Sequence, residues 1–138
     1  MTSRLPLHVL LIEDNAPLRR LMEQTLADAG LRVTGASCAD QALLALSSGP
    51  QADILLCDIR MPGCLDGLEL CRWVERMYPR TTIMLQTGFP GLNTGHFRVL
   101  QKPFSPDELV AYVREGLDPI SLERWHRSSL KMVAQREI

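Results

Sequence analysis

The chain has 138 residues, of which 46% are hydrophobic and 22% charged, and its formal net charge at pH 7 is -1. This composition fits one globular domain, and it excludes both wholesale disorder and a broadly basic surface for nucleic acid. No apolar run approaches the roughly 20 residues that span a bilayer. Residues 1–8 contain no signal-peptide core, so we expect a cytoplasmic protein that binds neither membrane nor nucleic acid directly.

Short apolar runs alternate with helical patterns along the chain. The largely apolar run at residues 8–12 is typical of a strand buried on both faces of a parallel sheet. The sequence predicts strands, in chain order, at residues 8–12, 31–36, 52–57, 81–86 and 97–101. It predicts helices at residues 17–29, 37–46, 68–78 and 105–117. This alternation indicates an α/β fold with a doubly wound, five-stranded parallel sheet.

Residue types that start helices support two of these boundaries. Ser37 is predicted to cap the second helix through its hydroxyl. Ser105 and Glu108 have the spacing of a capping box, and Pro106 takes the first helical position between them.

Two segments do not follow the alternation. Residues 88–96 are rich in glycine and lack a helical repeat of apolar side chains. Residues 118–138 place apolar side chains, among them Trp125, on one side of a predicted tail helix. Because this tail is too short for a second domain, we predict one domain at residues 1–117, a tail at 118–138 and no separate effector domain.

Chemically active side chains stand where the predicted strands end. Glu13 and Asp14 follow the first strand, Asp58 follows the third, Thr87 the fourth and Lys102 the fifth. The carboxyl ends of parallel strands meet at one edge of a sheet, and ligand sites form in the crevice there. We therefore expect these five side chains to converge.

Such a cluster of carboxylates needs a cation. Carboxylates within a few ångströms of one another repel, and one pKa rises unless a positive charge neutralises them. Mg²⁺ is suited to this role, because it prefers oxygen ligands and takes one or two carboxylates together with phosphate oxygens. With a lysine and a hydroxyl beside it, the cluster could stabilise a phosphoryl group carried on a carboxylate.

Five motifs occur in the order and at the strand ends found in receiver domains of two-component signalling. They are Leu10-Leu-Ile-Glu-Asp-Asn15, Asp58-Ile-Arg-Met-Pro-Gly63, Asp66-Gly-Leu-Glu-Leu70, Gln86-Thr-Gly88 and Lys102-Pro-Phe104. Residues 7–117 thus resemble a receiver domain of a response regulator. The resemblance implies a CheY-like, flavodoxin-like sheet with the strand order 2-1-3-4-5.

The resemblance also implies a role for each residue of the phosphorylation site. Asp58 is implied to be the phosphoacceptor. Thr87 and Lys102 are implied to contact the phosphoryl group after transfer, and Pro103 to follow a cis peptide bond that aims the lysine.

The implied metal is Mg²⁺. Asp14 is implied to bind it directly together with Asp58, and Glu13 at least partly through water. The backbone carbonyl of Arg60 is implied to complete the metal site.

The resemblance further implies a signalling partner. A sensor histidine kinase or a histidine phosphotransfer protein would donate the phosphoryl group, and phosphorylation would change protein–protein interactions. Beyond slow self-catalysed phosphoryl transfer and hydrolysis, no enzymatic activity is expected. The downstream target is left open, as is the choice between a monomer and a homodimer.

The sequence departs from the receiver pattern on the surface that receivers commonly use for output. The fourth helix, expected near residues 88–96, is predicted to be short or missing. Val99 stands where receivers usually have a tyrosine or phenylalanine switch. Phe89, Leu92 and the tail helix are candidates for an alternative output surface.

Each site residue also has a simpler interpretation when taken alone. Glu13 and Asp14 could be an acidic pair favoured by a helix dipole, Asp58 a turn residue, and Lys102 a solvated surface lysine. Their joint occurrence at strand ends favours the phosphorylation site over these interpretations.

Three other functions compete with the phosphorylation switch. A pseudo-receiver acting as a constitutive interaction module is the main alternative, because the switch aromatic is missing. A phosphatase of the haloacid-dehalogenase kind would need a second aspartate where Arg60 stands. A DNA-binding regulator is disfavoured because no helix-turn-helix fits in the tail.

Overall fold

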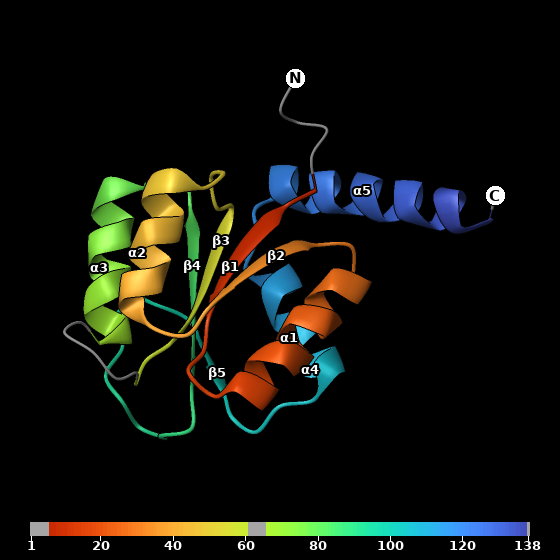
Figure 1. The fold of residues 1–138 in the computed structure, drawn as a ribbon. Helices are drawn as coiled ribbons and strands as arrows, with labels where there is room; N and C mark the ends of the chain where they lie inside the picture. Colours follow the sequence, from red (N-terminus) through yellow and green to blue (C-terminus); the bar gives the residue numbers. More distant parts are fainter. Residues whose placement is uncertain (1–5, 61–65, 138) are drawn as a thin grey trace.

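The computed structural model describes residues 6–60 and 66–137, with side chains described up to residue 130. Five parallel strands form one sheet in the order β2-β1-β3-β4-β5 (Figure 1). The strands are β1 (His8–Ile12), β2 (Arg32–Ala36), β3 (Ile54–Asp58), β4 (Thr82–Thr87) and β5 (Val99–Gln101). Both the parallel sheet and its strand order confirm the prediction.

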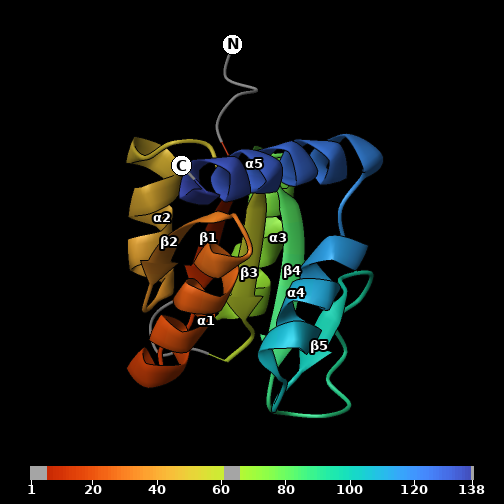
Figure 2. The ribbon, with the colours of Figure 1, turned by 90° about the vertical axis from the view of Figure 1, so that its right-hand side faces the viewer.

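Helices cover both faces of this sheet. They are α1 (Ala16–Asp28), α2 (Ala39–Ser48), α3 (Gly67–Met77), α4 (Pro106–Glu115) and α5 (Pro119–Glu137). Helices α2 and α3 lie side by side on one face, and α1 and α4 lie on the other (Figures 1 and 2). None of the described helices is long and apolar enough to cross a membrane.

The sheet is buried on both faces because its strands are apolar at successive positions. In β1, Val9 and Leu11 join the core beneath α1 and α4, whereas Leu10 and Ile12 join the core beneath α2 and α3. All five residues of β3 are likewise buried. This alternation between two cores is the physical basis of the double winding.

No helix connects β4 to β5, as predicted for residues 88–96, and residues 88–98 form turns and irregular structure. The His96 ring contacts Glu75 of α3 and fastens this connection to the neighbouring helix. Strand β5 begins two residues later than predicted. The reason is that the amide of Phe97 donates to the carbonyl of Thr94 in a turn, at 3.2 Å, and so leaves the ladder.

Of the two predicted helix caps, one is present in the structure and the other is not. The capping box of Ser105 and Glu108 is present at the start of α4. The prediction that Ser37 caps α2 was wrong, since the capping position belongs to Cys38, which makes no side-chain cap bond. The Ser37 hydroxyl instead donates to the side-chain oxygen of Gln41 at 2.9 Å, so it does not accept a backbone amide.

The predicted tail helix is α5, and it packs on its own domain. It lies across the end of the sheet opposite the site described below (Figure 1). The Trp125 side chain is 4% exposed, and its indole nitrogen donates to the carbonyl of Ala29 at 2.7 Å. Arg124 forms an ion pair with Asp53, 3.0 Å away, just before β3. Thus α5 is anchored to the region between α1 and β3.

Candidate functional site

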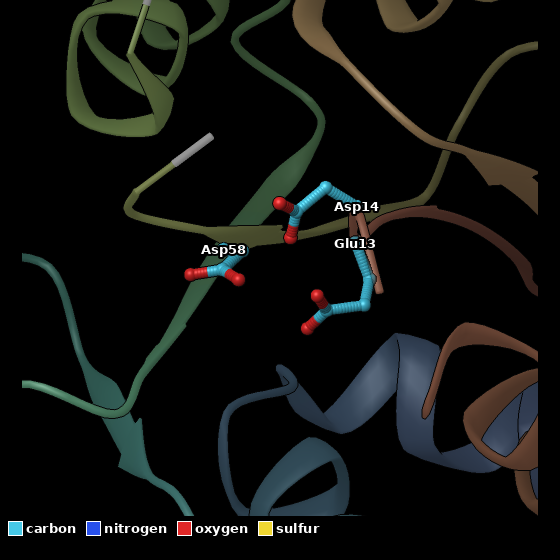
Figure 3. Close-up of side chains that lie close together, drawn as sticks. All are labelled: Glu13, Asp14 and Asp58. Atoms are coloured by element: carbon cyan, nitrogen blue, oxygen red, sulfur yellow. The ribbon is translucent and has the colours of Figure 1, made fainter. Parts of the chain in front are cut away.

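Three carboxylates meet at the carboxyl edge of the sheet. Glu13 and Asp14 directly follow β1, and Asp58 is the last residue of β3. One oxygen from each of the three lies within 4.8 Å of the others, and the side chains face a shared space (Figure 3). Glu13 and Asp58 are buried, whereas Asp14 is exposed, so this acidic cluster is open to solvent on the side of Asp14.

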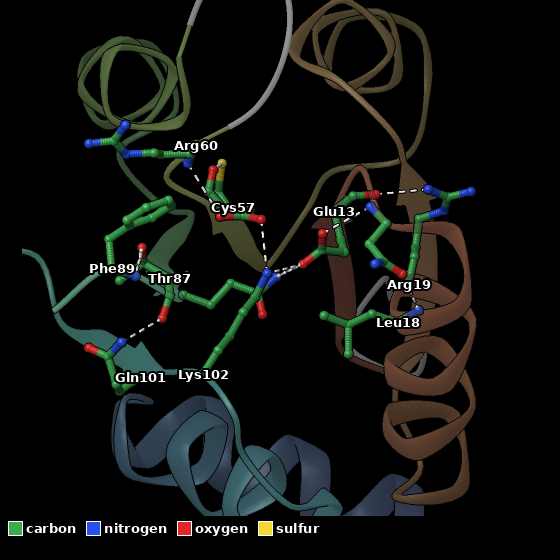
Figure 4. Close-up of polar contacts among 12 residues, drawn as sticks. Glu13, Leu18, Arg19, Cys57, Arg60, Thr87, Phe89, Gln101 and Lys102 are labelled. Carbon is green, nitrogen blue, oxygen red and sulfur yellow. Dashed lines mark hydrogen bonds and ion pairs between the residues drawn. The ribbon is translucent and has the colours of Figure 1, made fainter.

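Lys102 brings a positive charge into the acidic cluster. Its ammonium nitrogen lies 2.6 Å from Oε1 of Glu13 and 2.9 Å from Oδ2 of Asp58 (Figure 4). The lysine follows β5, where its amide donates to the Thr87 carbonyl at 2.7 Å, and the peptide bond to Pro103 is cis. Burial alone would lower the pKa of Lys102, but its hydrogen bonds to the two carboxylates outweigh burial and raise it.

Glu13 is enclosed by hydrogen-bond donors. Besides the Lys102 ammonium, it accepts the amide of Asn15 at 3.0 Å and the side-chain nitrogen of Gln86 at 3.4 Å. Burial nevertheless raises the pKa of Glu13, because it outweighs the hydrogen bonds from Lys102 and Asn15. A buried carboxylate whose pKa is raised is one that an added cation would stabilise.

Gln86 is a site residue to which sequence reasoning gave no role. Its amide nitrogen contacts Glu13, and its Oε1 atom is buried without a hydrogen-bond partner among the described residues. Its place beside Thr87 at the end of β4 was the available signal, because a polar residue inside a buried strand needs partners.

A backbone amide holds Asp58 on the side away from the lysine, where its Oδ1 atom accepts the Arg60 amide at 3.3 Å. Next to Asp58, the amide of Gly67 donates to the Ile59 carbonyl at 2.9 Å and brings the start of α3 close. A Cβ atom on Gly67 would lie only 1.9 Å from the Asp58 carbonyl oxygen. Only glycine therefore lets α3 begin this close to the backbone of Asp58.

Thr87 lies at the same edge, buried at the end of β4. Its hydroxyl oxygen accepts the amide of Phe89 at 3.1 Å, and its carbonyl accepts the Lys102 amide (Figure 4). The exposed Arg60 guanidinium stacks 4.3 Å from the centre of the Phe89 ring. The structure thus brings the backbone of residue 60 and the Thr87 hydroxyl to the flank of the acidic cluster.

Residues 9–114 match the family described as the response regulator receiver domain. This chain belongs to that family. Receiver domains are signalling switches that accept phosphoryl groups from histidine kinases, and they typically bind Mg²⁺ in an acidic pocket. They are not conventional enzymes.

Known relatives of this receiver domain include bacterial transcriptional regulators. The DNA-binding transcriptional regulator NtrC of Salmonella typhimurium is 35% identical over 116 residues, which cover 79% of this chain and 24% of NtrC. The C4-dicarboxylate transport transcriptional regulatory protein DctD of Rhizobium meliloti is 36% identical over 127 residues, covering 87% of this chain and 27% of DctD. The chain therefore spans about a quarter of the length of these relatives.

Solved structures share the fold of this receiver domain. A response regulator receiver protein from Sinorhizobium medicae superimposes with a TM-score of 0.75 at 30% identity, covering 83% of this chain and 97% of that one. The response regulator TrrA of Thermotoga maritima, solved in complex with Mg²⁺-BeF, superimposes with a TM-score of 0.72 at 26% identity. That match covers 80% of this chain and 99% of TrrA.

Proposed function

We propose that this receiver domain is a phosphorylation-dependent switch with Asp58 as its phosphoacceptor. The observation that supports this most directly is the position of the Lys102 ammonium, which bridges Glu13 and Asp58 at 2.6 and 2.9 Å. An ammonium fixed at this point can neutralise a phosphoryl oxygen in place of a carboxylate oxygen. Phosphoryl transfer requires mainly such positioning and charge neutralisation.

We propose Mg²⁺ as the cofactor, held by Glu13, Asp14 and Asp58 and by the backbone carbonyl of Arg60. The donor set fits, since three carboxylates within 4.8 Å offer the hard oxygen ligands that this ion prefers. When bound, Mg²⁺ supplies positive charge against the phosphoryl oxygens. The Mg²⁺-BeF complex of TrrA is consistent with such a site in a protein of the same fold.

In the proposed transfer, an Asp58 oxygen attacks the phosphorus atom of a phosphohistidine. A phosphorus–oxygen bond forms while the phosphorus–nitrogen bond of the donor breaks, and the leaving imidazole keeps the electron pair and takes up a proton. The Arg60 amide at Oδ1 and the Lys102 ammonium at Oδ2 hold the carboxylate in one orientation. This orientation lowers the entropic cost of the attack.

After transfer, Thr87 can bind the phosphoryl group without giving up its present partner. A hydroxyl has one donor and two acceptor sites, and the Phe89 amide at 3.1 Å uses only an acceptor site. The hydroxyl hydrogen is therefore free to turn toward a phosphoryl oxygen on Asp58. Phe89 would follow such a movement of Thr87, because their contact joins residues only two apart.

The proposed donor is a histidine kinase or a histidine phosphotransfer protein, and the proposed output is a change in protein–protein contacts. We expect no direct contact with nucleic acid, because the net charge of the whole chain is -1. The boundary at residue 117 and the cytoplasmic location stay predictions from the sequence.

The experiment is phosphorylation by acetyl phosphate, followed by intact mass. We expect an adduct of one phosphoryl group that needs Mg²⁺ and is absent in an Asp58→Asn variant. An Asp66→Asn variant is the matched control, because Asp66 caps α3 by accepting the Glu69 amide and lies outside the acidic cluster. An adduct that persists in Asp58→Asn would contradict the assignment of the phosphoacceptor.

The alternative of a constitutive interaction module has two supporting observations. The β4–β5 connection lacks a helix, and Val99 occupies the switch position. The same experiment separates the two functions, since a constitutive module would form no adduct and bind no Mg²⁺. Binding of beryllofluoride with Mg²⁺ then tells a competent site that hydrolyses its phosphate quickly from a site that cannot be phosphorylated.

A further inference from the structure

The outer seam between α2 and α3 contains two adjacent hollows. The first, of about 520 Å³, is lined by Leu43 of α2 and by Trp73, Arg72, Arg76 and Glu69 of α3. This hollow lies on the face of the sheet covered by α2 and α3, and it includes none of the residues of the acidic cluster.

The second hollow, of about 360 Å³, continues the seam past the end of α3. It is lined by Leu46 of α2, by Met77 at the end of α3, and by Tyr78 and Arg80, which follow that helix. Leu46 lies three residues after the α2 residue of the first hollow, and Met77 lies four residues after Trp73. The two hollows are therefore about one helical turn apart, or roughly 5 Å.

Exposed apolar side chains line this seam. Met77 is 58% exposed, and Trp73 is only partly buried where it meets Tyr78 edge to face, 5.9 Å between ring centres. Aromatic residues and methionine are enriched at the centres of protein interfaces. Apolar side chains beside a concave surface thus mark the seam as a place where a partner could bury apolar groups.

The seam also bears three arginines. Within the described residues, no ion pair or side-chain hydrogen bond engages the guanidinium of Arg72, Arg76 or Arg80. Glu75 of α3 contacts His96, and none of the described ion pairs joins it to these arginines. Glu69 is the only acidic residue among the described lining residues of the two hollows, so the seam has a local excess of positive charge in a chain whose net charge is -1.

We propose that the α2–α3 seam docks an acidic amphipathic helix of a partner protein. Apolar side chains at i and i+4 of one helix match two hollows one turn apart, as in helix-in-groove recognition. Glutamates flanking that apolar stripe would face Arg72 and Arg76, which share a side of α3 because they are four residues apart. Guanidinium groups bind carboxylates in a bidentate geometry, which gives such docking its specificity.

This docking surface goes beyond the phosphorylation switch and does not depend on it. The seam contains none of the site residues, and an Asp58→Asn variant is expected to retain it. Failure of phosphorylation and failure of docking would therefore be separate results.

The probe is a synthetic amphipathic helical peptide of about 18 residues, long enough for five turns, with leucines four apart and glutamates on the flanks. The ¹⁵N-labelled protein has two indole signals, one from Trp73 in the seam and one from the buried Trp125 on α5. We expect the peptide to shift the Trp73 signal and to leave the Trp125 signal in place. A peptide with the same leucines but lysine flanks should not bind.

Charge reversal tests the arginines. Arg72→Glu with Arg76→Glu should weaken peptide binding at least tenfold, since two charge-assisted contacts become repulsive. Arg20→Glu with Arg32→Glu is the matched control, because these arginines are exposed on α1 and β2 and the total charge changes equally. The control should bind within about twofold of the wild type, and both variants should keep the wild-type circular dichroism spectrum.

Several results would overturn the proposal. They are no binding at millimolar peptide, equal binding of the lysine peptide, and unchanged affinity in the Arg72 and Arg76 variant. Self-association in sedimentation that this variant abolishes would assign the seam to a second copy of the chain. Binding to vesicles of phosphatidylglycerol and phosphatidylcholine, lost in the same variant, would assign it to an anionic membrane surface.

Discussion

Replacing Trp125 by alanine tests whether α5 is a structural part of this domain. The indole is 4% exposed, and it packs in the core beneath α1 and α4 together with Leu26 and Val113. Removing a buried tryptophan side chain costs about 3–5 kcal/mol, because apolar contact is lost and a cavity remains. For a domain of this size we expect the melting temperature to fall by roughly 10 °C or more.

A second substitution at this position isolates the hydrogen bond. Trp125→Phe keeps most of the apolar packing but removes the donor that lies 2.7 Å from the Ala29 carbonyl. The cost should be about 1 kcal/mol. It should not be larger, because the Ser129 hydroxyl also donates to that carbonyl, at 3.3 Å.

The assay is equilibrium unfolding in urea followed by circular dichroism. Trp73→Phe is the control, because Trp73 is only partly buried on the opposite face of the sheet, and we expect it to change the free energy of unfolding by less than about 1 kcal/mol. If Trp125→Ala cost no more than this control, α5 would not be docked on the domain in solution, and the reasoning from burial would be refuted.

Three other perturbations have outcomes that follow from contacts. Gly67→Ala should destabilise the domain by more than about 2 kcal/mol in urea unfolding, because its Cβ would meet the Asp58 carbonyl at 1.9 Å, whereas Gly88→Ala, with open space around it, should be nearly neutral. Lys102→Met should lower the free energy of unfolding by about 3 kcal/mol in EDTA, because two buried carboxylates lose their positively charged partner. Added Mg²⁺ should restore part of this stability in thermal scans. Burial raises the pKa of Tyr112 to about 12, above an unfolded value of about 10. The neutral phenol therefore contributes its full share to the stability of the fold below pH 10, and this contribution is lost as the pH rises toward 12. Urea titrations across that range should show a fall of up to about 3 kcal/mol that Tyr112→Phe lacks, and an equal fall in both proteins would contradict it.

The missing helix between β4 and β5 changes which surfaces this receiver domain can offer. In its place, residues 88–98 are held by the His96 contact to α3 and by the Arg60 guanidinium over Phe89. The sequence named Phe89, Leu92 and the tail helix as candidates for an alternative output surface. Phe89 is 50% exposed, whereas Leu92 packs partly against the core beneath α2 and α3, and α5 packs on its own domain. The amide of Phe89 also donates to the Thr87 hydroxyl, so a single hydrogen bond joins Phe89 to the proposed phosphorylation site.

The sequence by itself determined the strands, their ends and the chemistry placed at those ends. Continuous apolar runs such as β1 and β3 can be buried only inside a sheet covered on both faces, so local pattern and fold agree. Because parallel strands share one carboxyl edge, the convergence of Glu13, Asp58 and Lys102 followed from the alternation alone. The sequence also predicted that the fourth helix is short or missing near residues 88–96, since that segment lacks an apolar repeat.

Only the tertiary structure decided contacts between segments that no local pattern links. The amide of Gln86 beside Glu13, the close approach of Gly67 to Asp58 and the docking of α5 on Ala29 each depend on how separate elements pack. The wrong prediction at Ser37 has a local cause instead, since its hydroxyl donates to the side chain of Gln41 only four residues along the chain. Propensity and periodicity describe one segment at a time, whereas the other three contacts arise from the distances between segments that the packed core sets.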